Sequence, residues 1–415
     1  MRCLIFKAAA LAVCIAVPAL AEPVHYDVRA RIAGDGVLDA DVRVTLPADA
    51  AGTQKAFVLG RRFTLRSVDG GRGARYAMSS ADSPVKDLQK LTFTYPAGKR
   101  VIRFRYSGPL NGGADETIPA IRPEGVELFI DAMWLPTGAD IQTMFDVDAW
   151  IDGLPRDAVV VAQGQVTRTA DGVRIHRRDL DVDLPMVAMA GLNRASTPGV
   201  EYYARDLSTP MSMLYREHAA AAAAYLQHWF GPLANPIRMV AVPRKSSMGY
   251  SRTAYTVVRD DGPERKDIPA VNAARHVSHE FAHAWWRSAS PLTDDFWLVE
   301  STADYVAMRY VEQALGAEAV KPLIDSKREP AAKGGPVMGH GRPTRVQLYL
   351  TGPLLLIDLE KKIGREKMDA LLLTVSKQTP NTTRQFLDAL TEVAGADVAR
   401  DFDAALHSNW SDAKP

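Results

Sequence analysis

The sequence predicts an α+β protein of several domains, in which a β-sheet domain of saddle or sandwich type precedes a mainly helical domain. Short alternating strands recur up to about residue 205, and helical periodicity dominates the rest of the chain. The length of 415 residues allows two or three domains with separate cores. We expect a leader at residues 1–21, the β domain at 22–205, the core of the helical domain at 206–318 and its C-terminal part at 319–415.

The leader has the three parts of a signal peptide. Arg2 and Lys7 are basic, the stretch from Ala8 to Val17 is apolar, and Ala19-Leu20-Ala21 has the small-x-small form of a signal peptidase site. An apolar stretch of about ten residues is too short to cross a bilayer as a stable helix. We therefore expect cleavage near Ala21 and a periplasmic or secreted location in a bacterium.

Composition argues against several classes of partner and site. Cys3 and Cys14 are the only cysteines and both lie in the leader, so the mature chain forms no disulfide and offers no thiolate to a metal. The formal net charge is +1 and the chain has no long basic run, so we expect no nucleic acid as a partner. No apolar stretch after the leader is long enough to span a membrane. The oligomeric state is not predicted.

Strand and turn signals alternate through the expected β domain. Val24–Ile32, Leu91–Tyr95 and Val101–Tyr106 alternate apolar and polar side chains, as half-buried strands do. Turn signals rich in glycine separate such runs, namely Gly34-Asp35-Gly36, Asp69-Gly70-Gly71 and Asn111-Gly112-Gly113.

Helix signals begin at Ser208-Thr209-Pro210, where a hydroxyl cap precedes a proline, and this helix is expected to stop at Gly231-Pro232. Two strands are expected next, at residues 237–242 and 250–258. A helix from Asp267 to Arg287 and a partner helix from Asp294 to Gly316 follow. After a glycine-rich loop at 334–343, amphipathic helices are expected at residues 344–363, 365–378, 382–394 and 397–407.

The first of these two partner helices carries the motif His279-Glu280-Phe281-Ala282-His283. The two histidines are one turn apart on one helical face, so both imidazoles can reach a single metal ion. Glu280 is adjacent, where a carboxylate can take a proton from a bound water. Glu300 on the next helix supplies a third ligand and leaves a fourth position open. The pattern therefore predicts a catalytic site with one zinc ion per chain.

Two further residues lie close to the predicted ligands. Asp304 is one turn after Glu300 on the same face, and we expect it to orient one zinc histidine. His276 shares the face of His279 and His283. We interpret it as a neighbour that lines the site, or as a structural histidine, because a further ligand would close the position that hydrolysis needs.

The segment from His279 to Tyr305 resembles the gluzincin metallopeptidases, and within them the family of membrane alanyl aminopeptidase and leukotriene hydrolase. Trp285-Trp286 after the motif is similar to the Trp-Phe of that family, and Trp297-Leu298-Val299-Glu300 is similar to its Trp-Leu-Asn-Glu. Tyr349-Leu350-Thr351-Gly352 is similar to its Tyr-Glu-Lys-Gly. Phe230-Gly231 and Trp134-Leu135-Pro136 also fit the family. The resemblance covers most of residues 22–410.

The resemblance implies a thermolysin-like zinc domain in a short form of the family, without the large C-terminal domain. It also implies that Glu280 is the general base and that Tyr349 stabilises the oxyanion. One departure concerns the strand that carries the substrate-binding glutamate of the family. Gly249 occupies the position of that glutamate, beside Tyr250, and both are candidate substrate-binding residues.

The predicted function is therefore hydrolysis of peptide bonds by a zinc-activated water, with a peptide as the substrate. An aminopeptidase is expected from the resemblance, and Gly249 keeps an endopeptidase open as an alternative. A zinc hydrolase acting on a non-peptide substrate and a peptide- or glycan-binding protein with a vestigial zinc site also remain alternatives.

Overall fold

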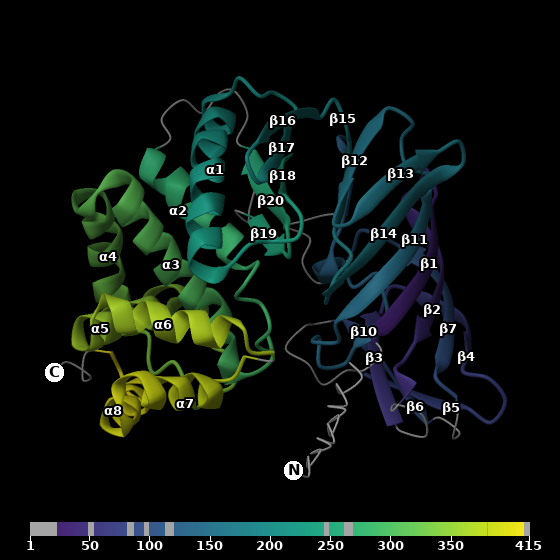
Figure 1. The fold of residues 1–415 in the computed structure, drawn as a ribbon. Helices are drawn as coiled ribbons and strands as arrows, with labels where there is room; N and C mark the ends of the chain where they lie inside the picture. Colours follow the sequence, from purple (N-terminus) through teal and green to yellow (C-terminus); the bar gives the residue numbers. More distant parts are fainter. Residues whose placement is uncertain are drawn as a thin grey trace, which may run out of the picture.

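The computed structural model describes residues 23–48, 54–80, 87–94, 99–112, 120–244, 249–260, 269–379 and 381–410. The predicted leader and its cleavage site lie outside the described residues. Strands dominate the N-terminal part and helices the C-terminal part, and the two parts lie side by side (Figure 1). This arrangement confirms the predicted α+β class.

The largest sheet of the N-terminal part has seven strands. The sheet is mixed, because strand β1 runs antiparallel to its neighbour β2 and parallel to its other neighbour β11. The strand order is β13 (Gln165–Thr169), β14 (Gly172–Asp181), β11 (Phe145–Asp152), β1 (Val24–Ile32), β2 (Val37–Thr45), β7 (Val101–Pro109) and β4 (Thr64–Asp69). The predicted strands at 24–32 and 101–106 are confirmed as β1 and β7.

Two four-stranded sheets complete the N-terminal part. One has the order β10 (Thr137–Gly138), β3 (Gln54–Gly60), β6 (Leu88–Thr94) and β5 (Arg75–Ser80). The other has the order β12 (Ala158–Ala162), β15 (Met186–Ala190), β9 (Gly125–Leu128) and β8 (Ile121–Arg122). A short 3₁₀ turn, η2 (Ile130–Ala132), follows β9 and reaches toward the helical part.

Alternating side chains explain the core between these sheets. In β1 the buried residues Val28, Ala30 and Ile32 alternate with exposed ones, so one face of the strand is apolar and packed. The main cluster of this core extends from Tyr26 to Ala188. A second large cluster extends from Val200 to Trp410 and fills the helical part. The domain boundaries at 205/206 and 318/319 stay predictions.

A five-stranded sheet begins the helical part. Its order is β16 (Asn193–Thr197), β17 (Val200–Ala204), β18 (Ile237–Pro243), β20 (Tyr255–Asp260) and β19 (Gly249–Arg252). The strand predicted at 250–258 is wrong as a single element, because the chain reverses at Thr253-Ala254 to form the β19–β20 hairpin. Ala254 takes a left-handed conformation at φ 53°, which a tight reversal requires.

Helices α1 and α2 pack against this sheet, and helices α3 to α8 pack on these two and on one another (Figure 1). Thr209 caps α1, its hydroxyl accepting a hydrogen bond of 3.1 Å from Ser212 N, and Gly231 ends the helix, as the sequence predicts. The bounds are α1 (Pro210–Phe230), α2 (Ala270–Ala282), η3 (Asp294–Phe296), α3 (Trp297–Leu315), α4 (Ala317–Ala332), η4 (Gln347–Thr351), α5 (Gly352–Ile363), α6 (Arg365–Ser376), α7 (Thr383–Ala394) and α8 (Ala396–Leu406).

The helices differ from the prediction in three places. The motif helix α2 ends at Ala282 rather than near Arg287, and the predicted cap Asp267 lies outside the described residues. The helix predicted at 344–363 is helical without a break from residue 345 to residue 363, but it contains the π-helical turn η4, which runs directly into α5. Helix α4 was not predicted, because Pro322 and Pro330 interrupt its apolar periodicity. Among the described residues, no helix is both long and apolar enough to cross a bilayer.

Candidate active site

Helices α2 and α3 bring the three predicted zinc ligands together. Candidate ligand atoms of His279, His283 and Glu300 all lie within 4.8 Å of one another. His283 follows the last residue of α2 but keeps helical angles, so it remains one turn from His279 on the same face. Glu300 projects from the first turn of α3, which packs directly against α2.

The three side chains converge on one carboxylate oxygen. Glu300 Oε2 lies 3.4 Å from His279 Nε2 and 3.7 Å from His283 Nε2. Among the described residues, this buried oxygen has no hydrogen-bond partner. A buried polar atom without a partner costs free energy, and a cation between the three groups would remove that cost. Two nitrogens and one oxygen also suit zinc, so these residues fit the ion that the motif predicts.

The orientation of His283 is fixed by the main chain. Its Nδ1 lies 3.1 Å from the carbonyl oxygen of Trp286. Because a carbonyl only accepts, Nδ1 is the donor in this contact, and the other ring nitrogen, Nε2, faces Glu300. Burial alone would raise the pKa of Glu300, but the two histidines and the hydroxyl of Tyr349 lower it to about 2. The site therefore offers a carboxylate oxygen and an imidazole nitrogen that face each other.

Glu280 lies beside this cluster and is held by β19. Ser251 Oγ donates a hydrogen bond of 2.9 Å to Glu280 Oε2, and it also lies 3.0 Å from Thr256 Oγ1. Glu280 as a whole residue is 7% exposed. Burial raises its pKa, and His283 and the Ser251 hydroxyl oppose the rise only in part. Glu280 is thus a desolvated carboxylate with one oxygen fixed in place.

His276 lies close to Glu280. Its Nδ1 is 3.9 Å from Glu280 Oε1, and its ring centre is 6.0 Å from that of Tyr215. The ligand group contains His279, His283 and Glu300 without His276. Of the two interpretations, a structural histidine beside Glu280 fits better, because His276 is not among the described residues that line the cavity around the ligands.

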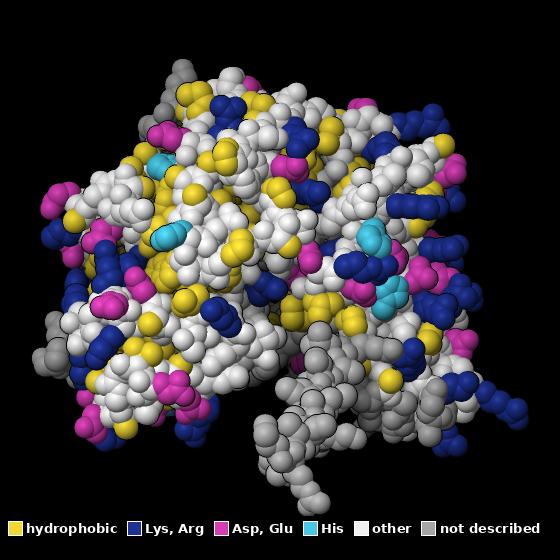
Figure 2. Space-filling model, in the orientation of Figure 1, with side chains coloured by type: hydrophobic (Ala, Val, Ile, Leu, Met, Phe, Trp, Pro, Cys, Tyr) yellow, Lys and Arg dark blue, Asp and Glu magenta, His cyan; other side chains and the backbone are white. Residues whose placement is uncertain are grey.

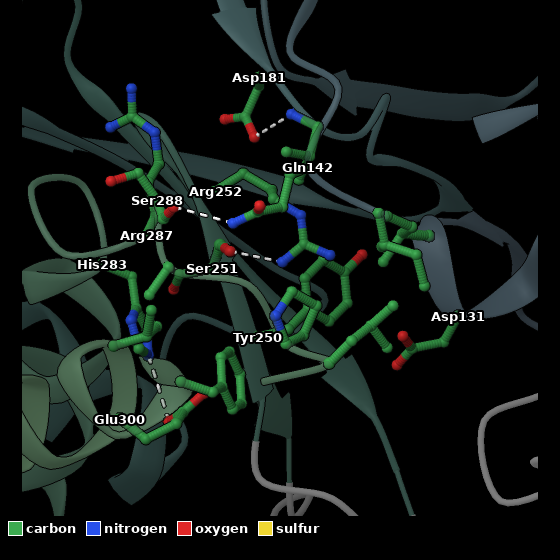
Figure 3. A pocket seen from close by; sticks show the side chains of 18 of the residues that line it. Asp131, Gln142, Asp181, Tyr250, Ser251, Arg252, His283, Arg287, Ser288 and Glu300 are labelled. Carbon is green, nitrogen blue, oxygen red and sulfur yellow. Dashed lines mark hydrogen bonds and ion pairs between the residues drawn. The ribbon is translucent and has the colours of Figure 1, made fainter. Parts of the chain in front are cut away.

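A cavity of about 650 Å³ opens in front of these residues. Its wall comes from both parts of the molecule, with Ile130 and Met133 on one side and Phe296 and Val299 on the other. Figure 3 shows His283 and Glu300 on one side of the cavity and Asp131 on the opposite side, with Tyr250 and Arg252 between them. Its volume lies in the range typical of ligand-binding sites in proteins.

Several solved structures of known proteins resemble this chain in architecture. No family model matches the sequence, and no curated protein matches it. Solved structures do match. A two-domain M1 zinc metallopeptidase bound to L-arginine aligns with a TM-score of 0.71 and 18% identity, over 95% of this chain and 96% of that chain. An M1 zinc metallopeptidase from Deinococcus radiodurans aligns with a TM-score of 0.70 and 17% identity, over 94% and 95%.

Leukotriene A4 hydrolase from Saccharomyces cerevisiae aligns with a TM-score of 0.70 and 14% identity, over 93% of this chain and 68% of that chain. The chain has the M1 zinc metallopeptidase fold. The resemblance inferred from the motif is therefore confirmed at the level of the fold, along nearly the whole length of the chain.

Within this M1 fold, Tyr349 lies on the π-helical turn η4, beside the predicted ligands. Its ring centre is 5.9 Å from that of His279, and Arg345 lies 5.1 Å above its ring. Burial and the neighbouring Glu300, to which the hydroxyl hydrogen-bonds, raise the pKa of Tyr349 well above its usual value. The phenol is therefore a neutral hydrogen-bond donor at any physiological pH.

Asp304 is fully buried and lies behind His279. Its Oδ1 is 3.8 Å from His279 Nδ1, which is longer than a hydrogen bond. The same carboxylate accepts hydrogen bonds from Arg275 and from Lys327 Nζ, the latter at 2.7 Å. Burial would raise the pKa of Asp304, but these two cations and His279 lower it. The carboxylate faces His279, the histidine that it was predicted to orient.

Gly249 and Tyr250 lie on β19 and line the cavity. A Cβ added to Gly249 would collide with the carbonyl oxygen of Val257 on β20. The Tyr250 ring stacks on Phe129 at 4.7 Å and 11°, and the guanidinium of Arg252 lies 5.4 Å from it. Tyr250 is therefore part of the packing between the two parts of the molecule as well as of the cavity wall.

Sequence reasoning missed Ser251, Arg275 and Lys327. Each acts on a predicted residue through a contact between elements distant in the sequence, and none belongs to a local motif. Figure 2 shows Lys and Arg side chains interspersed with Asp and Glu over both parts of the surface, as the near-zero net charge implies.

Proposed function

We propose that the protein is a zinc metallopeptidase. The observation that carries the proposal is the convergence of His279, His283 and Glu300 on one buried point, with Glu280 held beside it. The M1 fold supports the same chemistry, because several solved proteins with this fold are zinc metallopeptidases. Zinc bound by the three ligands would polarise the scissile carbonyl and lower the pKa of a coordinated water.

Glu280 is proposed as the general base. Burial raises its pKa, which makes the carboxylate a better proton acceptor than an exposed glutamate. Ser251 fixes Oε2, and the carboxylate keeps further lone pairs with which it would take the proton of the attacking water. The protonated carboxyl then delivers that proton to the leaving nitrogen of the peptide, and Glu280 returns to its starting state.

Tyr349 is proposed as the donor to the oxyanion that forms when the carbonyl is attacked. Its neutral hydroxyl lies beside Glu300 and faces the cavity. In the free protein it is bonded to Glu300, so it must turn from the carboxylate to the substrate oxygen as the reaction proceeds. One such donor typically contributes about 3 kcal/mol to transition-state stabilisation.

The enzyme could cleave a peptide at its N-terminus or at internal bonds. An aminopeptidase is one, and a Deinococcus radiodurans protein with this fold is described with a Tyr-Ser-Ala substrate. An endopeptidase is the second, and Gly249 favours it. Position 249 offers no carboxylate for a substrate amine, and the nearby Val257 carbonyl leaves no room for any side chain there.

A set of peptides tests both proposals. Each peptide is supplied with a free and with an acetylated N-terminus, and products are identified by mass spectrometry for the zinc-loaded protein and for Glu280→Gln. A metallopeptidase cleaves peptides that the variant leaves intact. Removal of N-terminal residues from free peptides alone identifies an aminopeptidase, and internal cuts in both forms identify an endopeptidase. Equal products from both proteins would reject the proposed function.

A further inference from the structure

A buried lysine connects two parts of the proposed centre. Lys327 lies in α4, is 4% exposed and carries a charge that lysine rarely buries without partners. Its Nζ donates hydrogen bonds of 2.7 Å to Asp304 Oδ2 and of 2.7 Å to the backbone carbonyl of Tyr349. One ammonium group thus bonds the carboxylate behind His279 and the residue proposed to stabilise the oxyanion.

The first branch of this connection leads to the metal ligands. Asp304 Oδ1 faces His279 Nδ1 at 3.8 Å, and Arg275 bonds the same carboxylate. Because Lys327 and Arg275 hold the two oxygens, the carboxylate cannot rotate away from the imidazole without breaking a buried ion pair. Outer groups of this kind set the orientation and basicity of a metal-bound histidine.

The second branch leads to the turn that carries Tyr349. Ser301, next to Glu300 on α3, donates a hydrogen bond of 2.7 Å to the carbonyl of Leu348. Gly352 lets the turn approach this far, because a Cβ at Gly352 would collide with the Ser301 hydroxyl. Lys327 bonds the next carbonyl along the turn. Helices α3 and α4 therefore hold η4 at two consecutive carbonyls.

We infer that Lys327 is a positioning residue of the centre, which fixes the metal ligand His279 through Asp304 and fixes Tyr349 through its carbonyl. The Tyr349 branch rests on the proposed function, whereas the His279 branch concerns metal binding alone. Without the ammonium, Asp304 keeps only Arg275, whose side chain is 32% exposed, and the Tyr349 carbonyl loses its partner. A buried polar group that loses its partner shifts to form another hydrogen bond. Both Asp304 and the turn that carries Tyr349 would then be held less firmly in place.

Lys327→Met in the full-length protein tests both branches, with Lys321→Met as the control. Lys321 lies on the same helix, but its side chain is 67% exposed and pairs only with Asp325 in the described structure. For Lys327→Met we expect zinc affinity, measured by chelator competition, to fall about 10–100-fold. At saturating zinc, we expect kcat for a peptide to fall at least about tenfold while KM changes less than about threefold. The control is expected to match the wild-type protein in zinc affinity, kcat and KM.

A double-mutant cycle isolates the Tyr349 branch. If Lys327 acts through Tyr349, then Lys327→Met lowers kcat far less in a Tyr349→Phe background than in the wild type. If Lys327→Met does not fold, the pair Lys327→Met with Asp304→Asn removes both buried charges and carries the same expectations for zinc affinity and kcat. That pair keeps the volume of the site but lacks the bond to the Tyr349 carbonyl.

Three results would overturn the inference. If zinc affinity and kcat of Lys327→Met lie within twofold of the control, Lys327 positions neither His279 nor Tyr349. If Tm falls while zinc affinity and kcat stay unchanged, Lys327 is a purely structural residue. Equal losses of kcat in the two Tyr349 backgrounds would remove the second branch. A wild-type protein that binds zinc but cleaves no peptide would contradict the proposed function, and the zinc measurements would still test the first branch.

Discussion

Ser251 Oγ lies 2.9 Å from Glu280 Oε2 and donates a hydrogen bond to it from the edge strand β19. The two residues come from different layers, a sheet and a helix, and meet at the wall of the cavity. Burial raises the pKa of Glu280, whereas this hydrogen bond favours the ionised carboxylate and lowers it. Ser251 therefore tunes the group that we propose as the general base.

Replacing Ser251 with alanine is expected to shift the pH dependence of catalysis. Loss of the hydrogen bond raises the pKa of Glu280 further, and a base must be ionised to accept a proton. The acid limb of the kcat/KM profile should therefore move to higher pH in Ser251→Ala. Ser251→Thr keeps a hydroxyl and should restore the wild-type limb. Profiles that coincide for all three proteins would show that the hydrogen bond has no effect on the base.

Glu280→Gln is expected to abolish most activity while keeping the metal. Loss of a general base costs about 10²–10⁴-fold in kcat, and glutamine leaves the three ligands unchanged. The raised pKa means that folding favours protonated Glu280, so stability is fully present below the unfolded value of 4.5 and falls as pH rises through the folded pKa. Metal-free Glu280→Gln should therefore have a Tm at pH 7 no lower than the wild type. A clearly lower Tm would contradict the conclusion that the ionised, buried carboxylate of Glu280 lowers the stability of the metal-free protein.

Glu300→Gln is expected to weaken zinc binding strongly. The pKa of Glu300 is lowered to about 2, so the wild-type residue is a carboxylate at any working pH, and glutamine removes that charge. Calorimetric titration with zinc should show at least about a tenfold loss of affinity. Glu318→Gln, on the exposed surface of α4, is the matched control. Equal affinities for the two variants would exclude Glu300 as a ligand.

Gly249→Ala tests how tightly β19 packs on β20. The added methyl group would collide with the Val257 carbonyl, and overpacking of this kind costs about 1–3 kcal/mol. Denaturant unfolding should show that loss. Gly34→Ala is the control, because a Cβ at Gly34 meets no atom within 4 Å. A Gly249→Ala protein as stable as the control would mean that a side chain fits there, and the structural argument for an endopeptidase would fail.

Local signals predicted much of the fold and the ligand set. Thr209 and Pro210 mark the start of α1 because a cap and a first-turn proline are read from adjacent residues. His279 and His283 could be placed for the same reason, since four-residue spacing defines one helical face. The hairpin at Thr253-Ala254 was missed because it contains none of the glycine or asparagine signals that mark tight reversals.

Contacts between distant elements could not be predicted. The bond between Ser251 and Glu280 depends on how β19 docks on α2, and the bonds of Lys327 depend on how α4 packs behind α3. Neither residue differs from its neighbours in a way that marks it in the sequence. The π-helical turn at Tyr349 was also missed, because the residues around it keep an ordinary helical pattern.

Titration of zinc into the metal-free protein, with peptide cleavage followed at each step, tests the central claim most directly. We expect cleavage to rise in proportion to added zinc and to reach a plateau at one equivalent per chain. Glu280→Gln should bind the same equivalent and cleave nothing measurable. Cleavage that is independent of zinc, or equal in the variant, would contradict a zinc peptidase centre built from His279, Glu280, His283 and Glu300.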